Sequence, residues 1–366
     1  MEKMNKPKII AYYLPQFHPF KENDEWWGEG FTEWTNVAKA KPLFKGHYQP
    51  KIPSVLGFYD LRLSEVREKQ AQLAKEAGVY GFCYWHYWFH GKELMELPFK
   101  KVLISGKPEF PFCLGWANES WMAKLWSKDS VTGKILIEQT YSLDDYVEHF
   151  NAYKVAFQDN RYIRIGGKPF FLIYRPLDMP DVNKFMQVWN KLISDAEIAD
   201  GFYFVAHARN EQECNLLRAM DFDAINIGPT TRCRDLYKGC NKTRLINKLR
   251  KLITGCPNLV DYKYINEIIW KKGYEDNDDV IPTLIPNWDH SPRGGKNSLV
   301  FSNSSPNLWK EQVNRVIRLT NQKNNKLIML KSWNEWGEGN YMEPDLKYGK
   351  ENIQILAEAI AHIVDK

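Results

Sequence analysis

The segment KLIMLKSWNEWGEG, residues 326–339, joins an apolar run to a polar turn that carries two glutamates. Its first half has the composition of a buried β-strand, and Glu335 and Glu338 follow among two tryptophans, an asparagine and two glycines. Polar side chains directly after a buried strand are typical of a site at the carboxyl end of a parallel sheet. If other apolar runs of the chain also end in polar residues, the pattern predicts a parallel sheet with a site at its carboxyl edge.

The chain contains eight such apolar runs, and several of them end in polar or aromatic residues. They are near-continuous rather than alternating, which is typical of parallel strands covered on both faces. Segments with helical periodicity lie between them at 64–78, 142–159, 180–197, 305–323 and 350–366. The apolar runs occupy residues 8–16, 79–88, 110–119, 169–176, 202–208, 223–228, 283–290 and 326–335.

This alternation predicts an α/β fold, and eight units predict a single (β/α)8 TIM barrel with long βα loops. An open, doubly wound sheet is the alternative, but it usually carries a glycine-rich phosphate turn after its first strand. The first strand here ends in YLPQFHPF, residues 13–20, which contains no glycine. We therefore expect one catalytic barrel over residues 1–366, with a long loop at 17–63 and a partly helical insertion at 229–280 that forms a lid.

Composition narrows the class of protein. Hydrophobic residues make up 44% and charged residues 26% of 366 residues, as in ordinary globular proteins. The formal net charge is +5, and the basic stretch near 242–252 is interpreted as a solvated helix face, so no nucleic-acid partner is expected. The sequence has no run of 18 apolar residues and no signal-peptide core, which predicts no membrane span and a cytoplasmic protein with reduced thiols.

Aromatic residues are frequent, at 14% of the chain, and many lie beside Gly, Asn, Asp, Glu or His. A sugar stacks its C–H groups on aromatic rings while its hydroxyls take hydrogen bonds, so this mixture indicates a carbohydrate site. Most of these clusters fall at the carboxyl ends of the predicted strands, which share one rim in a barrel. We predict an oligosaccharide or polysaccharide substrate that contacts Tyr13, Gln16, His18, Trp34, His86, Trp116, Asn118, Glu119, Tyr174, Arg175, His207, Trp288, Trp333, Asn334 and Trp336.

Glu335 and Glu338 are the candidates for catalysis. On a continuous strand, residues three apart point to opposite faces of the sheet. Gly337 between them and Gly339 after them predict a turn that brings both carboxylates over the barrel mouth. The alternative is a pair of exposed loop acids.

No metal and no cofactor are expected. His18, His86 and His207 follow three different strands without the local spacing of a zinc site, which favours neutral hydrogen-bonding roles. The stretch EDNDD, residues 275–279, contains a D-x-D pattern but lies in a polar run, which favours a solvated loop. The sequence has neither a glycine-rich phosphate loop nor a G-x-S-x-G elbow.

Acids among aromatic residues, with no sign of a metal, a phosphate loop or an activated serine, point to cleavage of a glycosidic bond. That reaction needs one carboxylic acid to protonate the leaving oxygen and a second carboxylate that acts at the anomeric carbon, directly or through water. Burial against tryptophans raises the pKa of such an acid, which keeps it protonated near neutral pH.

Over nearly its whole length the chain resembles the WbsX-like family, which is related to glycoside hydrolase family 99. Members of that family are often encoded with bacterial surface-polysaccharide genes. The resemblance rests on the strings AYYLPQFHP, NDEWWGEGFTEWTNVAKAKPLFKGHYQP, GFYDLR, GFCYWHYWF, FPFCLGWANE, GKPFFLIYRP and SWNEWGEGNYMEPD.

The resemblance implies a (β/α)8 barrel and a retaining mechanism. The hydrolase family carries a Glu-Trp-His-Glu signature near its last strand, and residues 335–338 match it except that Gly337 replaces the histidine. By this match Glu338 is the general acid/base, and Glu335 deprotonates a sugar 2-hydroxyl, which attacks C1 to give a 1,2-anhydro sugar. The implied substrate is a bacterial surface polysaccharide of O-antigen or capsule type with an α-manno- or α-rhamno-configured linkage.

Three other interpretations stay open at this point. A glycosyltransferase of polysaccharide biosynthesis would bind a nucleotide-sugar or a lipid-linked sugar. A non-catalytic carbohydrate-binding protein would need the aromatic residues but not the paired acids. A hydrolase that pairs Glu119 with Glu335 would follow an ordinary two-carboxylate mechanism.

Overall fold

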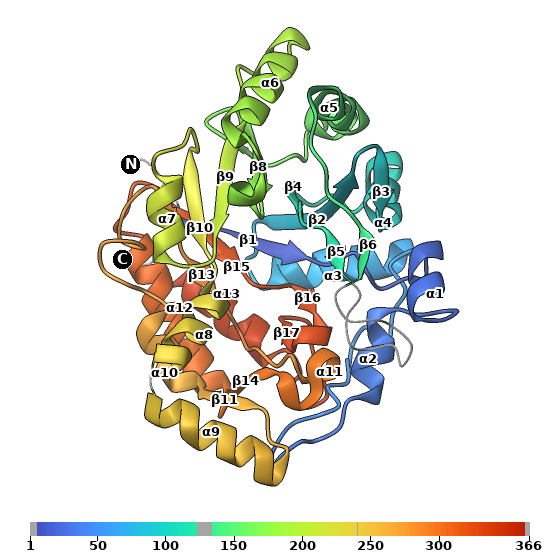
Figure 1. Cartoon of the computed structure of the whole chain (residues 1–366). Helices are drawn as coiled ribbons and strands as arrows, with labels where there is room; N and C mark the ends of the chain where they lie inside the picture. Colours follow the sequence, from blue (N-terminus) through green and yellow to red (C-terminus); the bar gives the residue numbers. More distant parts are fainter. Residues whose placement is uncertain (1–5, 123–133, 240, 363–366) are drawn as a thin grey trace.

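The computed structural model describes residues 6–122, 134–239 and 241–362. Short parallel strands form a nearly closed barrel in the order β12-β10-β9-β8-β4-β2-β1-β15-β13 (Figure 1). Pro282 interrupts the seventh barrel segment and divides it into β12, which pairs with β10, and β13, which pairs with β15. The barrel strands are β1 (Lys8–Tyr13), β2 (Gly81–Phe89), β4 (Phe112–Trp116), β8 (Lys168–Ile173), β9 (Tyr203–Ala208), β10 (Ala224–Ile227), β12 (Val280–Ile281), β13 (Thr283–Leu284) and β15 (Leu327–Leu330).

The predicted barrel is confirmed, and each of the eight apolar runs contains or overlaps a barrel strand. The seventh run was placed too late in the chain. The barrel strand there covers 280–284, and residues 285–290 form the loop that follows it. Trp288, Asp289 and His290 therefore lie in the loop beyond the strand, at the rim where the sequence predicts them.

Helices surround the barrel, and the five predicted helical segments are present. Ser142, Asp181 and Ser305 cap three of them, since each side chain accepts a hydrogen bond from a backbone N–H in the first turn. The helix at 64–76 begins with Ser64 itself, after Leu63. The predicted helices are α3 (Ser64–Glu76), α5 (Leu143–Gln158), α6 (Val182–Asp195), α12 (Pro306–Thr320) and α13 (Glu351–Ala361), and residues 363–366 lie outside the described chain.

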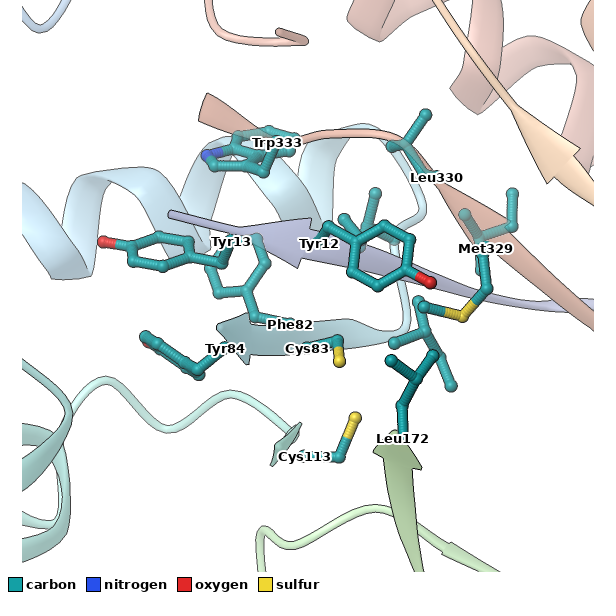
Figure 2. Close-up of a cluster of buried hydrophobic side chains, with 14 of the residues drawn as sticks. Tyr12, Tyr13, Phe82, Cys83, Tyr84, Cys113, Leu172, Met329, Leu330 and Trp333 are labelled. Carbon is teal, nitrogen blue, oxygen red and sulfur yellow. The ribbon is translucent and has the colours of Figure 1, made fainter. Parts of the chain in front are cut away.

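Side chains of the barrel strands alternate between the barrel interior and the surrounding helices. On β1, the Tyr12 hydroxyl donates to Asn226 Oδ1 of β10 at 2.8 Å, so Tyr12 points inward. Tyr13 points outward and donates to Gln70 Oε1 of α3 at 2.7 Å. Figure 2 shows the two tyrosine rings leaving β1 in different directions. This alternation decides which strand-end residues reach the mouth.

The cysteines of the described chain are buried free thiols. Cys83 and Cys113 are register partners on β2 and β4, and Figure 2 shows their sulfur atoms side by side in the core. They act there as small apolar side chains. Cys214, Cys233 and Cys256 are also free and buried, whereas Cys240 lies outside the described residues.

Two long connections add structure at the carboxyl end of the barrel. The first loop, 17–63, contains α1 (Lys21–Trp27) and α2 (Glu33–Lys39). The insertion 229–280 contains α8 (Pro229–Gly239), α9 (Asn241–Thr254), β11 (Asn258–Asp261) and α10 (Tyr262–Ile268), which confirms its helical content. Its role as a lid stays a prediction.

Shorter elements complete the chain. β11 pairs in parallel with β14 (Leu299–Ser302) beside the barrel. The others are β3 (Lys92–Leu94), α4 (Leu97–Ser105), β5 (Trp121–Met122), β6 (Ile135–Ile137), β7 (Arg164–Ile165), α7 (Glu211–Leu217), α11 (Ser291–Gly294), β16 (Asn334–Glu335) and β17 (Asn340–Tyr341), with 3-10 turns η1 (Pro176–Asp178), η2 (Gly295–Asn297) and η3 (Trp336–Glu338).

Candidate active site

Inward-facing aromatic side chains line the mouth of the barrel. The rings of Tyr12 and Trp85 stack with centroids 4.8 Å apart, and Trp85 contacts Tyr174 edge-on at 5.2 Å. Tyr174 in turn stacks on His207 at 5.0 Å. Trp85 and Tyr174 are partly exposed, so this row of rings offers apolar faces to a ligand that enters the mouth.

Asn226 connects the two ends of this row, Tyr12 and His207, inside the barrel. Its Oδ1 accepts the Tyr12 hydroxyl bond and lies 3.3 Å from His207 Nδ1, while its Nδ2 donates to Thr283 Oγ1 at 2.8 Å. Burial lowers the pKa of His207 to about 3, so its ring is neutral near pH 7. A neutral imidazole that stacks and hydrogen-bonds fits the role predicted for it.

The chain beyond β15 turns sharply and gathers the two glutamates. β16 and β17 form an antiparallel hairpin around the η3 turn, and Gly339 ends that turn with a φ of 58°, in the left-handed region. Arg293 Nη2 lies 2.6 Å from Glu335 Oε1, and Arg293 Nη1 lies 3.0 Å from Glu338 Oε1. The turn that the glycines predict therefore brings both carboxylates to one guanidinium.

A third carboxylate, from the long first loop, joins the same guanidinium. Glu33 Oε2 of α2 lies 3.0 Å from Arg293 Nε and 2.9 Å from Arg293 Nη2. A Cβ atom on Gly337 would lie 2.1 Å from Glu33 Oε2 and 2.8 Å from Arg293 Nε. Glycine at 337 is thus required for the close approach of Glu33. We call Glu33, Glu335, Glu338 and Arg293 the carboxylate cluster.

The carboxylate cluster has three acids for one buried cation, so it holds a proton readily. Burial raises the pKa of Glu335 to about 8; Glu338 and Glu33 add to this rise, and Arg293 opposes it. Burial lowers the pKa of Arg293, but its three acidic neighbours outweigh this and hold it above the ordinary value. Near neutral pH one carboxyl group of the cluster therefore stays protonated.

Asp289 supports the turn that carries Glu338. Its backbone N–H donates to the Glu338 carbonyl oxygen at 2.6 Å, and its Oδ2 accepts from Gln49 Nε2 at 2.6 Å and lies 2.9 Å from His47 Nε2. Despite burial, Lys51 and His47 hold the pKa of Asp289 well below its usual range. Asp289, Gly339 and Lys51 are among the residues that line a cavity of about 240 Å³.

The family model described as "Glycosyltransferase WbsX" matches residues 9–356. The chain belongs to the WbsX family. Among curated proteins it is similar to two described as "Uncharacterized protein WxcX", from two strains of Xanthomonas campestris pv. campestris. Each is 33% identical over 364 residues, which are 98% of this chain and 50% of the relative. The chain thus spans about half the length of the curated relatives it matches.

Solved structures share the fold of this WbsX-family chain. A "Glycoside hydrolase-like protein" superposes with a TM-score of 0.60 at 16% identity, over 98% of this chain and 95% of that one. The "GH99 endo-alpha-mannosidase from Bacteroides thetaiotaomicron" gives a TM-score of 0.53 at 14% identity, over 97% and 96%. At these identities the similarity establishes the fold, and the predicted resemblance to both groups is confirmed.

Three predicted contact residues of the WbsX-family barrel face the helices instead of the mouth. Tyr13 reaches α3, His86 Nε2 lies 2.5 Å from His149 Nε2 of α5, and the Trp116 indole donates to the Trp88 carbonyl at 3.2 Å. Successive side chains of a strand point to opposite faces, so an aromatic residue or a histidine at a strand end can point toward the helices instead of the barrel interior. The predictions for Tyr13, His86 and Trp116 are corrected accordingly.

Three predicted tryptophans and two predicted asparagines are buried or hydrogen-bonded within the protein itself. Trp333 and Trp336 are fully buried, and the Trp336 indole donates to Glu343 Oε2 at 2.6 Å. Trp34, also buried, donates to the Tyr59 carbonyl at 2.7 Å. The side chains of Asn118 and Asn334 each bond both backbone groups of another residue, Arg175 and Leu14 respectively. These five residues position the site and are corrected as substrate contacts.

Other predicted residues lie nearer the mouth. Gln16, Tyr174 and Arg175 follow strand ends and are partly exposed, and the Glu119 side chain is half-exposed. Their contacts with a substrate remain predictions, as does that of His207. His18 and Trp288 are only 2% and 6% exposed, which leaves little surface for a substrate.

The sequence prediction overlooked several residues of the site. Trp85 and Tyr87 lie on the inward face of β2, and burial together with Glu335 raises the pKa of the Tyr87 hydroxyl. Their alternation with His86 could have identified them. Glu33 and Arg293 lie far from Glu335 in the sequence, and no local pattern connects them.

Two classes of feature are not found in the described chain. Among residues 6–122, 134–239 and 241–362, no three His, Cys, Asp or Glu side chains converge as a metal site. In the same ranges, no helix is both long and apolar enough to cross a bilayer.

Proposed function

We propose that this protein cleaves glycosidic bonds, with Glu335 and Glu338 as its catalytic residues. The proposal rests on one observation, that both carboxylates contact the Arg293 guanidinium beside a mouth lined with aromatic rings. Membership of the WbsX family and the fold shared with an endo-alpha-mannosidase support it. The proposed substrate is a bacterial surface polysaccharide of O-antigen or capsule type, cut at an α-manno- or α-rhamno-configured linkage.

The proposed reaction has two steps. Glu335 takes the proton of the sugar 2-hydroxyl, the 2-oxygen attacks C1 from the side opposite the leaving group, and the bond from C1 to the leaving oxygen breaks as Glu338 protonates that oxygen. In the second step Glu338 takes a proton from water, whose oxygen attacks C1 and opens the 1,2-anhydro ring. The 2-oxygen regains its proton from Glu335, so both glutamates return to their starting states.

This chemistry selects the linkage that we propose. The 2-oxygen can attack C1 from the back only when it lies trans to the leaving group, as in α-mannosides and α-rhamnosides. Arg293 limits the negative charge on the pair, and the raised pKa of Glu335 keeps one proton in the cluster. In the form that starts the reaction this proton lies on Glu338, while Glu335 is ionised and acts as the base. Trp85, Tyr87 and Tyr174 are partly exposed aromatic residues, and we propose that they stack against sugar rings.

Oligosaccharides with fluorescent reducing ends test this function. We expect the protein to release shorter labelled fragments from a panel with α-manno and α-rhamno linkages, and to leave the matched β-linked panel intact. An equal rate on both panels would contradict the proposed geometry, and no cleavage of surface polysaccharides that carry these linkages would contradict the function.

A glycosyltransferase is the second candidate, because the family description itself names that activity. A transferase would bind a nucleotide-sugar donor. Titration calorimetry with a set of nucleotide-sugars therefore separates the two candidates. The hydrolase that we propose shows no heat of binding with any of them, whereas a saturable signal with one donor favours the transferase.

The pH dependence of the reaction depends on the proton that the carboxylate cluster retains. Both steps need one carboxyl group protonated and another ionised, so the singly protonated cluster is the active form. Burial and the neighbouring acids raise the pKa of Glu335 to about 8, so the cluster loses its shared proton near that pH. No carboxyl group is then left to act as the acid, and we expect kcat/KM to fall as the pH rises through about 8.

Glu33→Gln tests whether the carboxylate cluster causes the fall of kcat/KM at high pH. Removing one negative neighbour lowers the pKa of Glu335, so the falling limb of kcat/KM moves to lower pH. Glu29→Gln, an exposed acid of the same loop, serves as the control and leaves the limb in place. A profile that still rises above pH 9, or one that Glu33→Gln does not move, contradicts the role of the cluster.

A further inference from the structure

The helix α9 has its apolar side turned away from the protein. Leu245, Ile246, Leu249, Leu252 and Ile253 are between 50% and 81% exposed. At 3.6 residues per turn, these five side chains lie within an arc of about 120° around the helix axis. We call them the apolar stripe of α9. Surface helices normally turn such a stripe toward the core, so this arrangement is inverted.

The opposite side of α9 is basic and is attached to the protein. Lys251 Nζ donates to Asn297 Oδ1 of η2 at 2.7 Å, and α9 also contacts α8 and β11. Lys248 and Arg250 are exposed and border the stripe on its two sides, by the same helical geometry. The apolar stripe is therefore a continuous surface with a cation along each edge.

The charged residues of α9 are all basic. The sequence of α9, NKTRLINKLRKLIT, has five lysines and arginines and no acid. Those five positive charges equal the formal net charge of the whole chain, +5. A partner that covers α9 must accept an apolar stripe and supply negative charge beside it over the length of one helix.

We propose that α9 binds the surface of an anionic lipid bilayer and lies parallel to it. The apolar stripe enters the boundary between head groups and acyl chains, while Lys248 and Arg250 contact the anionic head groups. Charge complementarity favours this occupant, because a bilayer offers negative charge along both edges of the stripe and acyl chains between them. This inference does not depend on the proposed glycosidase activity.

Co-sedimentation with lipid vesicles tests the proposal. We expect the protein to pellet with vesicles of phosphatidylcholine and phosphatidylglycerol in equal amounts, and at least tenfold less with phosphatidylcholine alone. Binding falls as sodium chloride rises to 0.5 M, since salt screens exposed charges. The double variant Leu252→Asp/Ile253→Asp abolishes binding, and Lys248→Glu/Arg250→Glu weakens it at least tenfold.

Ile104→Asp is the matched control, because Ile104 lies on α4 and is 87% exposed. It leaves vesicle binding unchanged. All of these substitutions are at exposed positions, so we expect each variant to fold. Circular dichroism and thermal unfolding check this. Absence of binding to the anionic vesicles, or an equal loss with Ile104→Asp, overturns the proposal. A dimer in light scattering that only Leu252→Asp/Ile253→Asp dissociates also overturns it, because a second copy then covers the stripe.

Discussion

Glu335→Gln and Glu338→Gln are each expected to lower kcat/KM on an α-manno-configured oligosaccharide by about 10³-fold, the usual contribution of a positioned acid or base. Glutamine keeps the size of each side chain but can neither take nor give the proton that the reaction moves. The effect is measured as the rate of fragment release under first-order conditions, at the pH optimum of the unchanged protein.

Glu119→Gln is the control that separates two mechanisms. The Glu119 side chain is half-exposed and lies 3.8 Å from Arg175, outside the carboxylate cluster. If Glu335 and Glu338 are the pair, this variant loses less than tenfold in kcat/KM. If Glu119 and Glu335 act together instead, Glu119→Gln loses as much as Glu335→Gln, and Glu338→Gln remains active. That outcome would contradict the assignment made here.

Gly337→Ala is expected to lower kcat/KM by about 10²-fold, because a displacement near 1 Å at a catalytic group costs that much. The new methyl group would lie 2.1 Å from Glu33 Oε2 and 2.8 Å from Arg293 Nε. Glu33 must therefore move, and Arg293, which holds Glu335 and Glu338, moves with it. Gly337→His, which restores the hydrolase signature, is expected to be at least as damaging in this chain.

The double variant Glu33→Ala/Gly337→Ala shows whether crowding is the cause. Removing the Glu33 carboxylate makes room for the methyl group, so the double variant recovers at least tenfold over Gly337→Ala alone. Glu33→Ala by itself provides the reference rate. Strictly additive losses in the two single variants would show that residue 337 acts by some route other than its contact with Glu33.

Apolar runs and amphipathic segments were sufficient to predict the barrel, because a strand that is buried on both faces has a nearly continuous run of apolar residues. They also predicted the glycine turn that gathers Glu335 and Glu338. Three contact residues failed for one reason: Tyr13, His86 and Trp116 have the outward phase of the strand alternation. Applying that alternation to β2 would have selected Trp85 and Tyr87 instead.

The contacts of Glu33 and Arg293 with Glu335 and Glu338 could not be predicted from the sequence. Glu33 and Arg293 come from different loops and meet only because the barrel closes between β1 and the last strands. Their meeting point also explains the departure from the hydrolase signature. The space beside residue 337, where the signature has a histidine, is occupied here by the Glu33 carboxylate and the Arg293 guanidinium.

The most direct test of the central claim follows the first-formed product by time-resolved proton NMR, with an α-mannoside that has a 2-hydroxyl and its matched 2-deoxy analogue. Two inversions at C1 through a 1,2-anhydro sugar give the α anomer first, and the 2-deoxy analogue, which lacks the attacking oxygen, stays uncleaved. Initial release of the β anomer, or cleavage of the 2-deoxy analogue at a comparable rate, would contradict the roles of Glu335 and Glu338.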